Sequence, residues 1–160
     1  MEVTREKKLE LINKIGFFTR FDDSDKITIS DLASFKQYQP NENLIQQNSN
    51  NTQLFFIING TVDIVIDGKT VVSLAGGGHV FGEMSFVHES PASASVVANT
   101  KVVAMIFDTT KINLMVEPIY YKLRMDIYRS CAEILAQRLI HTNSIATTSI
   151  KNEKSGEIDF

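Results

Sequence analysis

Residues 60–72, with the sequence GTVDIVIDGKTVV, decide the fold class of this chain. β-Prone residues, with apolar and polar side chains alternating, flank the pair Asp67-Gly68, as expected of two half-buried strands. An Asp-Gly pair accepts the positive φ angles of a tight two-residue turn. The stretch therefore predicts a β-hairpin.

Shorter runs of the same kind extend in both directions from the hairpin. Across residues 35–108 the chain alternates short β-prone segments with Gly, Asn, Asp or Pro. This spacing is typical of an antiparallel roll or sandwich, because each strand must be followed by a turn. The region therefore predicts a mainly β domain.

Helical patterns flank this β-rich region. Apolar residues recur at helical spacing within residues 4–15, and a turn followed by another short helix is expected within 17–33. After the last strand we expect a helix over 109–116, capped by Thr109 or Thr110, and then the longest helix over 118–140.

The length of 160 residues predicts one hydrophobic core. We expect residues 1–141 to form one domain. Residues 142–160 are rich in Ser, Thr, Asn, Lys and Glu, so burial there cannot offset the loss of conformational entropy. They are expected to form a flexible polar tail or linker.

Composition excludes several classes of partner. The net charge is −3, so the basic surface that nucleic-acid binding requires is missing. No segment approaches the roughly 20 apolar residues of a membrane span, which predicts a cytoplasmic protein without a membrane partner. The single cysteine, Cys131, cannot form an internal disulfide or a cysteine-rich metal site, and we expect it to be a buried apolar residue.

The candidate binding chemistry lies in residues 76–98, GGGHVFGEMSFVHESPASASVVA. Gly82 allows a close approach of the backbone to a ligand, and the amides of residues 83–85 can begin a short helix that attracts an anion. The Glu83 carboxylate can accept hydrogen bonds from a sugar hydroxyl. Together these features indicate a nucleotide.

This segment resembles the phosphate-binding cassette of the cyclic-nucleotide-binding domain family, the effector domain of catabolite activator protein and of protein kinase A regulatory subunits. That cassette runs from Phe-Gly-Glu to Pro-Arg-x-Ala, and the matching residues are 81–83 and 91–94. Similarity extends to residues 38–45, 54–60 and 136–139 and covers roughly residues 9–143.

The resemblance implies a mainly β fold with flanking α-helices, an eight-stranded β-roll of the jelly-roll or double-stranded β-helix type. It implies a cyclic mononucleotide, cAMP or cGMP, as ligand, with Glu83 on the ribose and Ser93 with the local amides on the phosphate. It implies no cofactor, no metal and no catalysis. The ligand-binding residues expected on this basis are Phe81, Gly82, Glu83, Met84, Ser85, Ala92, Ser93, Leu74 and Val96.

Ala92 departs from the family pattern, because it stands where the family has the arginine that pairs with the cyclic phosphate. A hydrogen bond to a charged group contributes about 1.5–3 kcal/mol, so its loss weakens binding roughly ten- to a hundredfold. Glu83 adds repulsion between its carboxylate and the phosphate. The sequence therefore predicts weak binding, which a protonated His88 would offset only in part.

The sequence matches neither of two enzyme classes, cupin-type metalloenzymes and hydrolases with a serine nucleophile. A cupin-type metal site needs clustered histidines, whereas His79, His88 and His141 include no His-x-His pair. Hydrolysis needs an activated nucleophile, and neither Ser85 nor Ser93 lies in a nucleophile-elbow sequence. We therefore expect a regulatory domain and not an enzyme.

An alternative is that the roll serves protein contact without nucleotide. The 118–140 helix carries an apolar stripe that either pairs with a second copy, giving a homodimer, or covers the roll. Too few residues follow for a helix-turn-helix module, so we expect a bacterial sensor or adaptor acting through a separate output domain or protein partner. The stripe comprises Leu123, Ile127, Cys131, Ile134 or Leu135, and Leu139.

Overall fold

The computed structural model describes residues 3–88, 90–114 and 116–155. By its internal contacts the chain divides into two units, Met1–Arg124 and Met125–Phe160, and each is described by itself. The domain boundary expected after residue 141 stays a prediction.

Three short helices open the first unit: α1 (Arg5–Ile12), the 3-10 helix η1 (Gly16–Arg20) and α2 (Asp23–Leu32). The sequence predicted both α-helices. The hydroxyl of Thr4 accepts from the amide of Lys7 at the start of α1, and the carboxylate of Asp22 accepts from the amide of Asp25 at the start of α2. These caps fix where the two helices begin.

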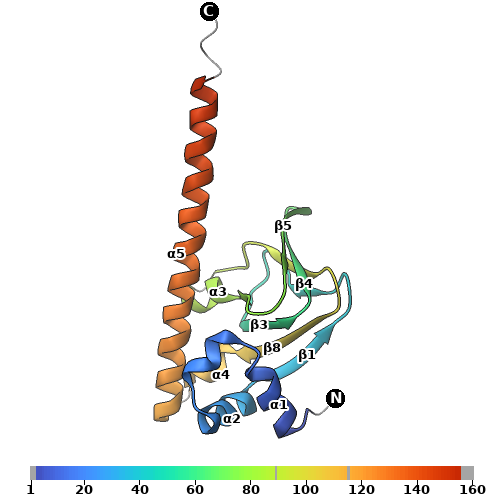
Figure 1. Ribbon diagram of the computed structural model, residues 1–160, viewed down its shortest axis with the longest axis vertical. Helices are drawn as coiled ribbons and strands as arrows, with labels where there is room; N and C mark the ends of the chain where they lie inside the picture. The colour runs from blue at the N-terminus through green and yellow to red at the C-terminus, as the bar shows by residue number, and fades with distance from the viewer. Residues whose placement is uncertain (1–2, 89, 115, 156–160) are drawn as a thin grey trace, which may run out of the picture. The chain divides into compact units, whose positions relative to one another are not determined.

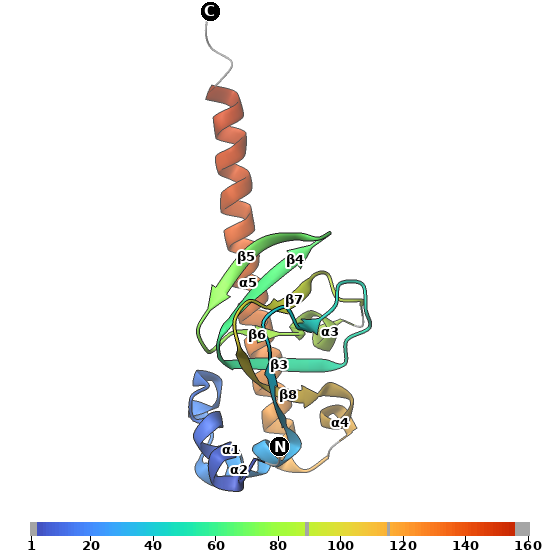
Figure 2. The ribbon, with the colours of Figure 1, turned by 90° about the vertical axis from the view of Figure 1, so that its right-hand side faces the viewer.

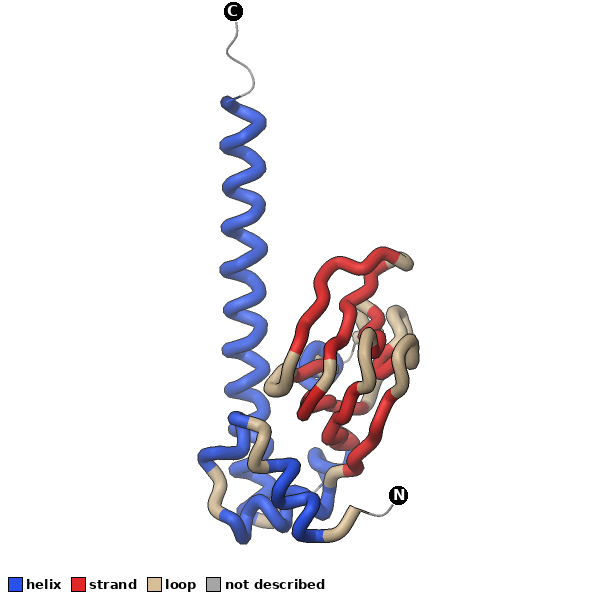
Figure 3. The backbone as a smooth tube through the Cα atoms, turned by 45° about the vertical axis from the view of Figure 1, so that its right-hand side comes forward, coloured by secondary structure: helices blue, strands red, loops and turns tan. Residues whose placement is uncertain are grey.

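The strands form two four-stranded antiparallel sheets with the orders β1-β8-β3-β6 and β2-β7-β4-β5. This arrangement is the jelly roll that the resemblance implied, and Figure 3 shows the strands in red gathered beside the N-terminal helices. The strands are β1 (Ser34–Tyr38), β2 (Asn43–Ile45), β3 (Gln53–Asn59), β4 (Thr61–Ile66), β5 (Lys69–Ala75), β6 (Val80–Phe81), β7 (Ser95–Ala98) and β8 (Val102–Asp108).

The hairpin predicted at residues 60–72 is the β4–β5 pair. Its turn residues Asp67 and Gly68 have φ angles of 50° and 76°, and Ile66 pairs with Lys69 across the turn. The side chain of Gln47 ties the turn to the rest of the roll, because its carbonyl accepts from the Asp67 amide at 2.9 Å and its amino group donates to the Asp67 carboxylate at 3.1 Å.

An aromatic cluster joins the first helices to the roll. Phe18 of η1 is fully buried, and its ring centroid lies 5.2 Å from that of Phe56 on β3 and 6.2 Å from that of Phe107 on β8. Figures 1 and 2 show α1 and α2 with α4 (Thr109–Leu114) at this end of the sheets. The helices therefore close one end of the roll.

Asp108 caps α4, although the sequence pointed to Thr109 or Thr110. Its carboxylate accepts from the amide of Thr110 at 3.0 Å and from the hydroxyl of the same residue at 2.5 Å. These bonds hold the pKa of Asp108 below its ordinary value. Thr109 instead donates from its hydroxyl to the Thr52 carbonyl at 2.9 Å, which joins α4 to the roll.

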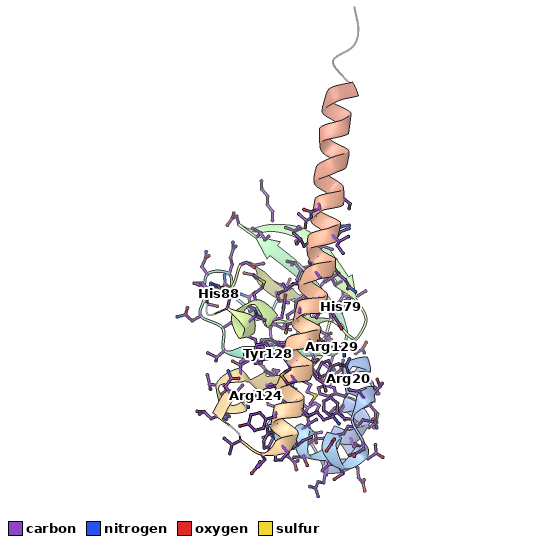
Figure 4. The ribbon with its side chains drawn as sticks, turned by 90° about the vertical axis from the view of Figure 1, so that its left-hand side faces the viewer. Arg20, His79, His88, Arg124, Tyr128 and Arg129 are labelled. Atoms are coloured by element: carbon purple, nitrogen blue, oxygen red, sulfur yellow. The ribbon has the colours of Figure 1, made fainter. Side chains whose placement is uncertain are left out.

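The last helix, α5 (Pro118–Ser155), begins at the proline that the sequence assigned to its first turn. Lys122 near its start pairs with Asp25 of α2 at 3.2 Å and lies 4.8 Å from the centre of the Phe21 ring. Arg124, labelled in Figure 4, donates to the Asn113 carbonyl at 3.1 Å. The first turns of α5 are thus held within the first unit.

The helix is longer than predicted, because it continues through Ser155 and not only to residue 140. The polar residues 142–155 include no Gly or Pro, so nothing in the sequence stops the helix before Gly156. Helical structure therefore replaces the flexible chain expected over 142–155, while residues 156–160 lie outside the described residues. The assignment of 142–160 as a tail or linker stays a prediction. Among the helices described, none combines the length and apolar character required to cross a membrane.

Candidate functional site

Gly82 joins β6 to the short helix α3 (Glu83–Val87) in a conformation that requires glycine. Its φ is 88°, and a Cβ atom placed there would lie 2.2 Å from the Gln53 carbonyl oxygen and 2.8 Å from the Asn51 side-chain nitrogen. The sequence assigned Gly82 to a close backbone approach, and the structure shows the approach to be to the 51–53 segment.

Glu83 is the first residue of α3, and only 2% of its surface is exposed. A carboxylate in the first turn interacts favourably with the positive end of the helix dipole. The buried Phe86, whose amide donates to the Gly82 carbonyl at 3.2 Å, anchors the same turn. Local backbone bonding therefore fixes the position of a buried acidic group.

Ala92 lies near the other end of the cassette, and hydrogen bonds of its backbone hold it in place. Its amide donates to the Ser49 carbonyl at 2.9 Å, and its carbonyl accepts from the Asn48 amide at 2.8 Å. The methyl side chain is buried in the apolar interior of the roll. Both backbone groups of Ala92 are thus engaged within the protein.

The segment 46–53, a loop that leads into the first residue of β3, contacts both Gly82 and Ala92. It was not predicted to be part of the site. Residues 48 and 49 of the loop pair with Ala92, while residues 51 and 53 face Gly82. Ser95 of β7 adds a further link, because its buried hydroxyl accepts from the Gln47 amide at 2.9 Å. The QNSNN sequence of residues 47–51 signals a turn, but no local pattern indicates these distant partners.

Four of the predicted site residues meet in one apolar cluster inside the roll. Phe81, Ala92 and Val96 belong to it, and the half-buried Leu74 packs against it. The strand register explains this, because β4 lies between β5 and β7. Leu74 pairs with Val62 of β4, and Val96 pairs with Ile64, two residues further along the same strand. The cluster comprises Tyr38, Leu44, Ile45, Phe55, Ile57, Val62, Phe81, Ala92, Val96, Ala98, Val102, Ala104 and Ile106.

Three other predicted site residues lie outside this cluster. Met84 is 39% exposed and Ser93 is exposed, so both side chains face solvent to a large extent. Ser85 is half-buried, and its hydroxyl donates to the Ser90 carbonyl at 3.4 Å. Ligand contact by any of the nine predicted residues stays a prediction.

The histidines of the cassette do not come together. A ring nitrogen of His79 lies 3.2 Å from the Ala75 carbonyl, whereas His88 is exposed at the end of α3. Figure 4, where both are labelled, shows them well apart. Within residues 3–88, 90–114 and 116–155, no three His, Cys, Asp or Glu side chains are grouped to hold a metal ion.

Acidic side chains outnumber basic ones in the roll. Burial raises the pKa of the Tyr38 phenol, and the nearby Glu42 carboxylate raises it further. Residues 37–100 contain five acidic side chains and one basic side chain: Glu42, Asp63, Asp67, Glu83, Glu89 and Lys69. Lys69 is exposed next to the hairpin turn, and Lys36 of β1 and Lys101 just before β8 bring the basic side chains of residues 34–108 to three against six acidic ones.

Residues 35–117 match the profile of the cyclic nucleotide-binding domain. The chain belongs to the cyclic nucleotide-binding domain family. It is 31% identical over 100 residues to a cAMP-dependent protein kinase regulatory subunit of Debaryomyces hansenii, covering 61% of this chain and 22% of the relative. It is 30% identical over 108 residues to the type II regulatory subunit of Drosophila melanogaster, covering 64% of this chain and 29% of that protein.

Solved structures of this family share the fold. A putative cyclic nucleotide-binding protein from Geobacter metallireducens aligns with a TM-score of 0.66 and 18% identity, covering 86% of this chain and 99% of the other. The regulatory subunit of a cAMP-independent protein kinase A from Trypanosoma brucei aligns with a TM-score of 0.63 and 23% identity, covering 84% and 49%.

The chain therefore contains a domain of this family and resembles part of the protein kinase A regulatory subunits. It spans only about a quarter of the length of the curated relatives it matches, at 22% and 29%. Those relatives are regulatory subunits of kinases and come from eukaryotes, so the bacterial source expected from the sequence stays a prediction.

Proposed function

We propose that this domain is a non-enzymatic cytoplasmic sensor or adaptor whose ligand binds between the Gly82 turn and the Ala92 segment that precedes β7. The ligand is a nucleotide of the cAMP or cGMP type, bound weakly because Ala92 replaces the family's arginine. A protein partner or separate output domain receives the signal.

The observation that supports this proposal is that Gly82 and Ala92, near the two ends of the cassette, both contact the segment 46–53. Gly82 lies against residues 51 and 53, Ala92 pairs with residues 48 and 49, and the side chains of Phe81 and Ala92 enter one apolar cluster. Residues ten positions apart in sequence are thereby held on either side of the same short segment.

Each side chain has a role that fits its surroundings. In this proposal the Glu83 carboxylate accepts hydrogen bonds from the ribose hydroxyls, since a carboxylate is an acceptor only. Leu74 and Val96 offer apolar surface to the base. Ser93 is exposed and can donate a neutral hydrogen bond to a phosphate oxygen, which replaces only part of what a guanidinium contributes.

Calorimetric titration of cAMP and cGMP tests the proposal. We expect weak binding to the wild-type chain and roughly ten- to a hundredfold tighter binding of at least one nucleotide to Ala92→Arg. Ala94→Arg, which adds the same charge two residues away, serves as the control and should gain less. Absence of binding by the wild type and by Ala92→Arg, with both folded, would contradict the proposal.

The exposed face of α5 favours a second candidate, a homodimer or protein-docking module. Met125, Tyr128 and Leu139 are 68%, 42% and 60% exposed. Of the predicted stripe, Leu123, Ile127 and Cys131 are buried, and only its last member, Leu139, is among these exposed residues. Residues 121, 125, 128, 132, 135 and 139 alternate steps of four and three, the spacing of a coiled-coil seam.

Light scattering distinguishes this candidate from the first. If α5 pairs with a second copy, Met125→Glu should convert a dimer to a monomer without loss of fold, because an exposed methionine contributes to the seam and not to the core. Gln137→Glu, at an exposed position outside the seam, is the control for added charge. A monomeric wild-type chain at all concentrations would remove the dimer.

A further inference from the structure

We infer that the exposed seam of α5 binds an amphipathic helix with acidic flanks from another protein, in preference to a second copy of this chain. Because it concerns the same helix face, the inference rests on the protein-docking function proposed for α5, and it adds the chemistry of the partner. The α5 seam comprises Tyr121, Met125, Tyr128, Ala132, Leu135 and Leu139.

The α5 seam is an apolar surface that is largely open to solvent. Met125 and Leu139 are 68% and 60% exposed, and Tyr121 and Tyr128 are 52% and 42% exposed. Alternating steps of four and three give the narrow stripe that packs against one other helix, whereas a helix that lies on a membrane has a broad apolar face. A second helix is therefore the occupant whose shape fits.

The residues that border the seam are basic wherever they carry a charge. With Met125 at position a and Tyr128 at position d of a heptad repeat, residues 122–143 supply the e and g positions on the two flanks. Those positions hold Lys122, Arg124, Arg129, Cys131, Ala136, Arg138 and Asn143. Four of them are basic and none is acidic. The two acidic residues of the same stretch, Asp126 and Glu133, lie at b positions, outside the flanks.

Arg124 and Arg129, both labelled on α5 in Figure 4, keep their charge beside the seam. Arg124 donates to a neutral backbone carbonyl at 3.1 Å, and its guanidinium lies 4.6 Å from the centre of the Tyr121 ring. Arg129 pairs with Glu133 at 3.0 Å, but these side chains are 72% and 55% exposed, and such a surface pair contributes little. Lys122 is paired with an aspartate of α2, so the two arginines matter most.

A second copy of α5 fits this surface poorly, because it would bring arginines together. In a parallel pair, a g residue faces the e residue five positions further along the other helix, which sets Arg124 against Arg129. In an antiparallel pair with the seams fully overlapped, g faces g and e faces e, which sets Arg124 against Arg138 and Arg129 against itself. Like charges across an interface lower affinity, whereas Glu or Asp on the flanks of a partner helix would meet cations in either direction.

The experiment uses two synthetic helices that differ only in the charge of their flanks. Each contains about four heptads with Leu at every a and d position, and one has Glu and the other Lys at every e and g position. Each labelled peptide is titrated with the chain of residues 1–160, and its fluorescence anisotropy is measured at low ionic strength. We expect the Glu peptide to bind at least about tenfold tighter than the Lys peptide, and the difference to shrink as salt is added.

Two variants with the same change in net charge separate the flank from the rest of the helix. Arg129→Gln removes one flanking cation and should weaken binding of the Glu peptide about two- to fivefold. Gln137→Glu also lowers the net charge by one, but at an exposed position outside the seam and its flanks, and should leave binding nearly unchanged. Met125→Glu should weaken binding at least about tenfold, because it places a charge in the apolar seam. Equal effects of Arg129→Gln and Gln137→Glu would overturn the inference.

The other outcomes separate the inference from the proposed function. If the Lys peptide binds as tightly as the Glu peptide, the inference is wrong and the docking function stands. If neither peptide binds and light scattering shows a dimer that Met125→Glu abolishes, the occupant is a second copy and the inference is wrong. If the chain binds neither peptide but sediments with phosphatidylserine vesicles, the occupant is a membrane and the inference is wrong. If the chain stays monomeric and binds neither peptides nor vesicles, both the inference and the docking function are wrong, whereas the nucleotide site is tested separately by titration of cAMP and cGMP.

Discussion

Replacing Gly82 by alanine tests whether the close contact between Gly82 and the 51–53 segment stabilises the fold. Gly82 and Gly76 have the same φ of 88°, but their surroundings differ. A Cβ atom at Gly82 would lie 2.2 Å from a backbone oxygen of Gln53, whereas a Cβ atom at Gly76 would have nothing within 4 Å. Gly76→Ala is therefore a matched control for backbone strain alone.

The expected loss of stability follows from these two effects. A non-glycine residue in the left-handed region costs about 1–3 kcal/mol, and this cost applies to both variants. Gly82→Ala adds a steric clash with a backbone atom that cannot rotate away, and such overpacking costs about 1–3 kcal/mol more. Gly82→Ala should therefore lower the free energy of unfolding by about 2–6 kcal/mol in total.

Urea unfolding followed by tyrosine fluorescence, without ligand, measures both free energies. The account predicts that Gly82→Ala is less stable than Gly76→Ala by about 1–3 kcal/mol, with similar dependence of the free energy on urea concentration. Equal stabilities of the two variants would show that the 51–53 segment does not lie against Gly82, and would refute the reasoning.

Two further predictions concern the ends of the roll. Leu123→Ala should destabilise the protein by about 2–5 kcal/mol because the side chain is fully buried, whereas Leu114→Ala, at 82% exposure, should have little effect; thermal unfolding checks both. Thr110→Ala should raise the pKa of Asp108 toward its ordinary value, since the Thr110 hydroxyl is the main cause of its lowering, and an unchanged pKa in an NMR titration of the carboxyl carbon would contradict this. Because folding lowers the pKa of Asp108, its contribution to stability is present at neutral pH and is lost as the pH falls through the folded-state value, below about pH 4.

Elements set by local chemistry were predictable from the sequence. The hairpin at Asp67-Gly68 was one, because an Asp-Gly pair between β-prone runs has few alternatives, and both residues have positive φ. Pro118 at the start of α5 was another. The family resemblance, carried by residues 81–83 and 91–94, supplied the sheet arrangement that local patterns alone left open between roll and sandwich.

Features that depend on distant contacts were not predictable. The loop 46–53 reaches Gly82 and Ala92 across more than 25 residues, and its polar sequence signals only a turn. The end of α5 was missed for a different reason: polar residues favour solvent but do not forbid a helix when Gly and Pro are absent. The buried state of Glu83 likewise follows from packing and not from its residue type.

The central claim is that the Gly82 turn and the Ala92 segment that precedes β7 form one ligand site. Amide chemical shifts measured by NMR during separate titrations with cAMP and cGMP test this most directly. The account predicts saturating shifts that cluster in residues 81–85 and 91–96 and report a single dissociation constant. Saturating shifts confined to other regions, such as residues 118–140, would contradict it.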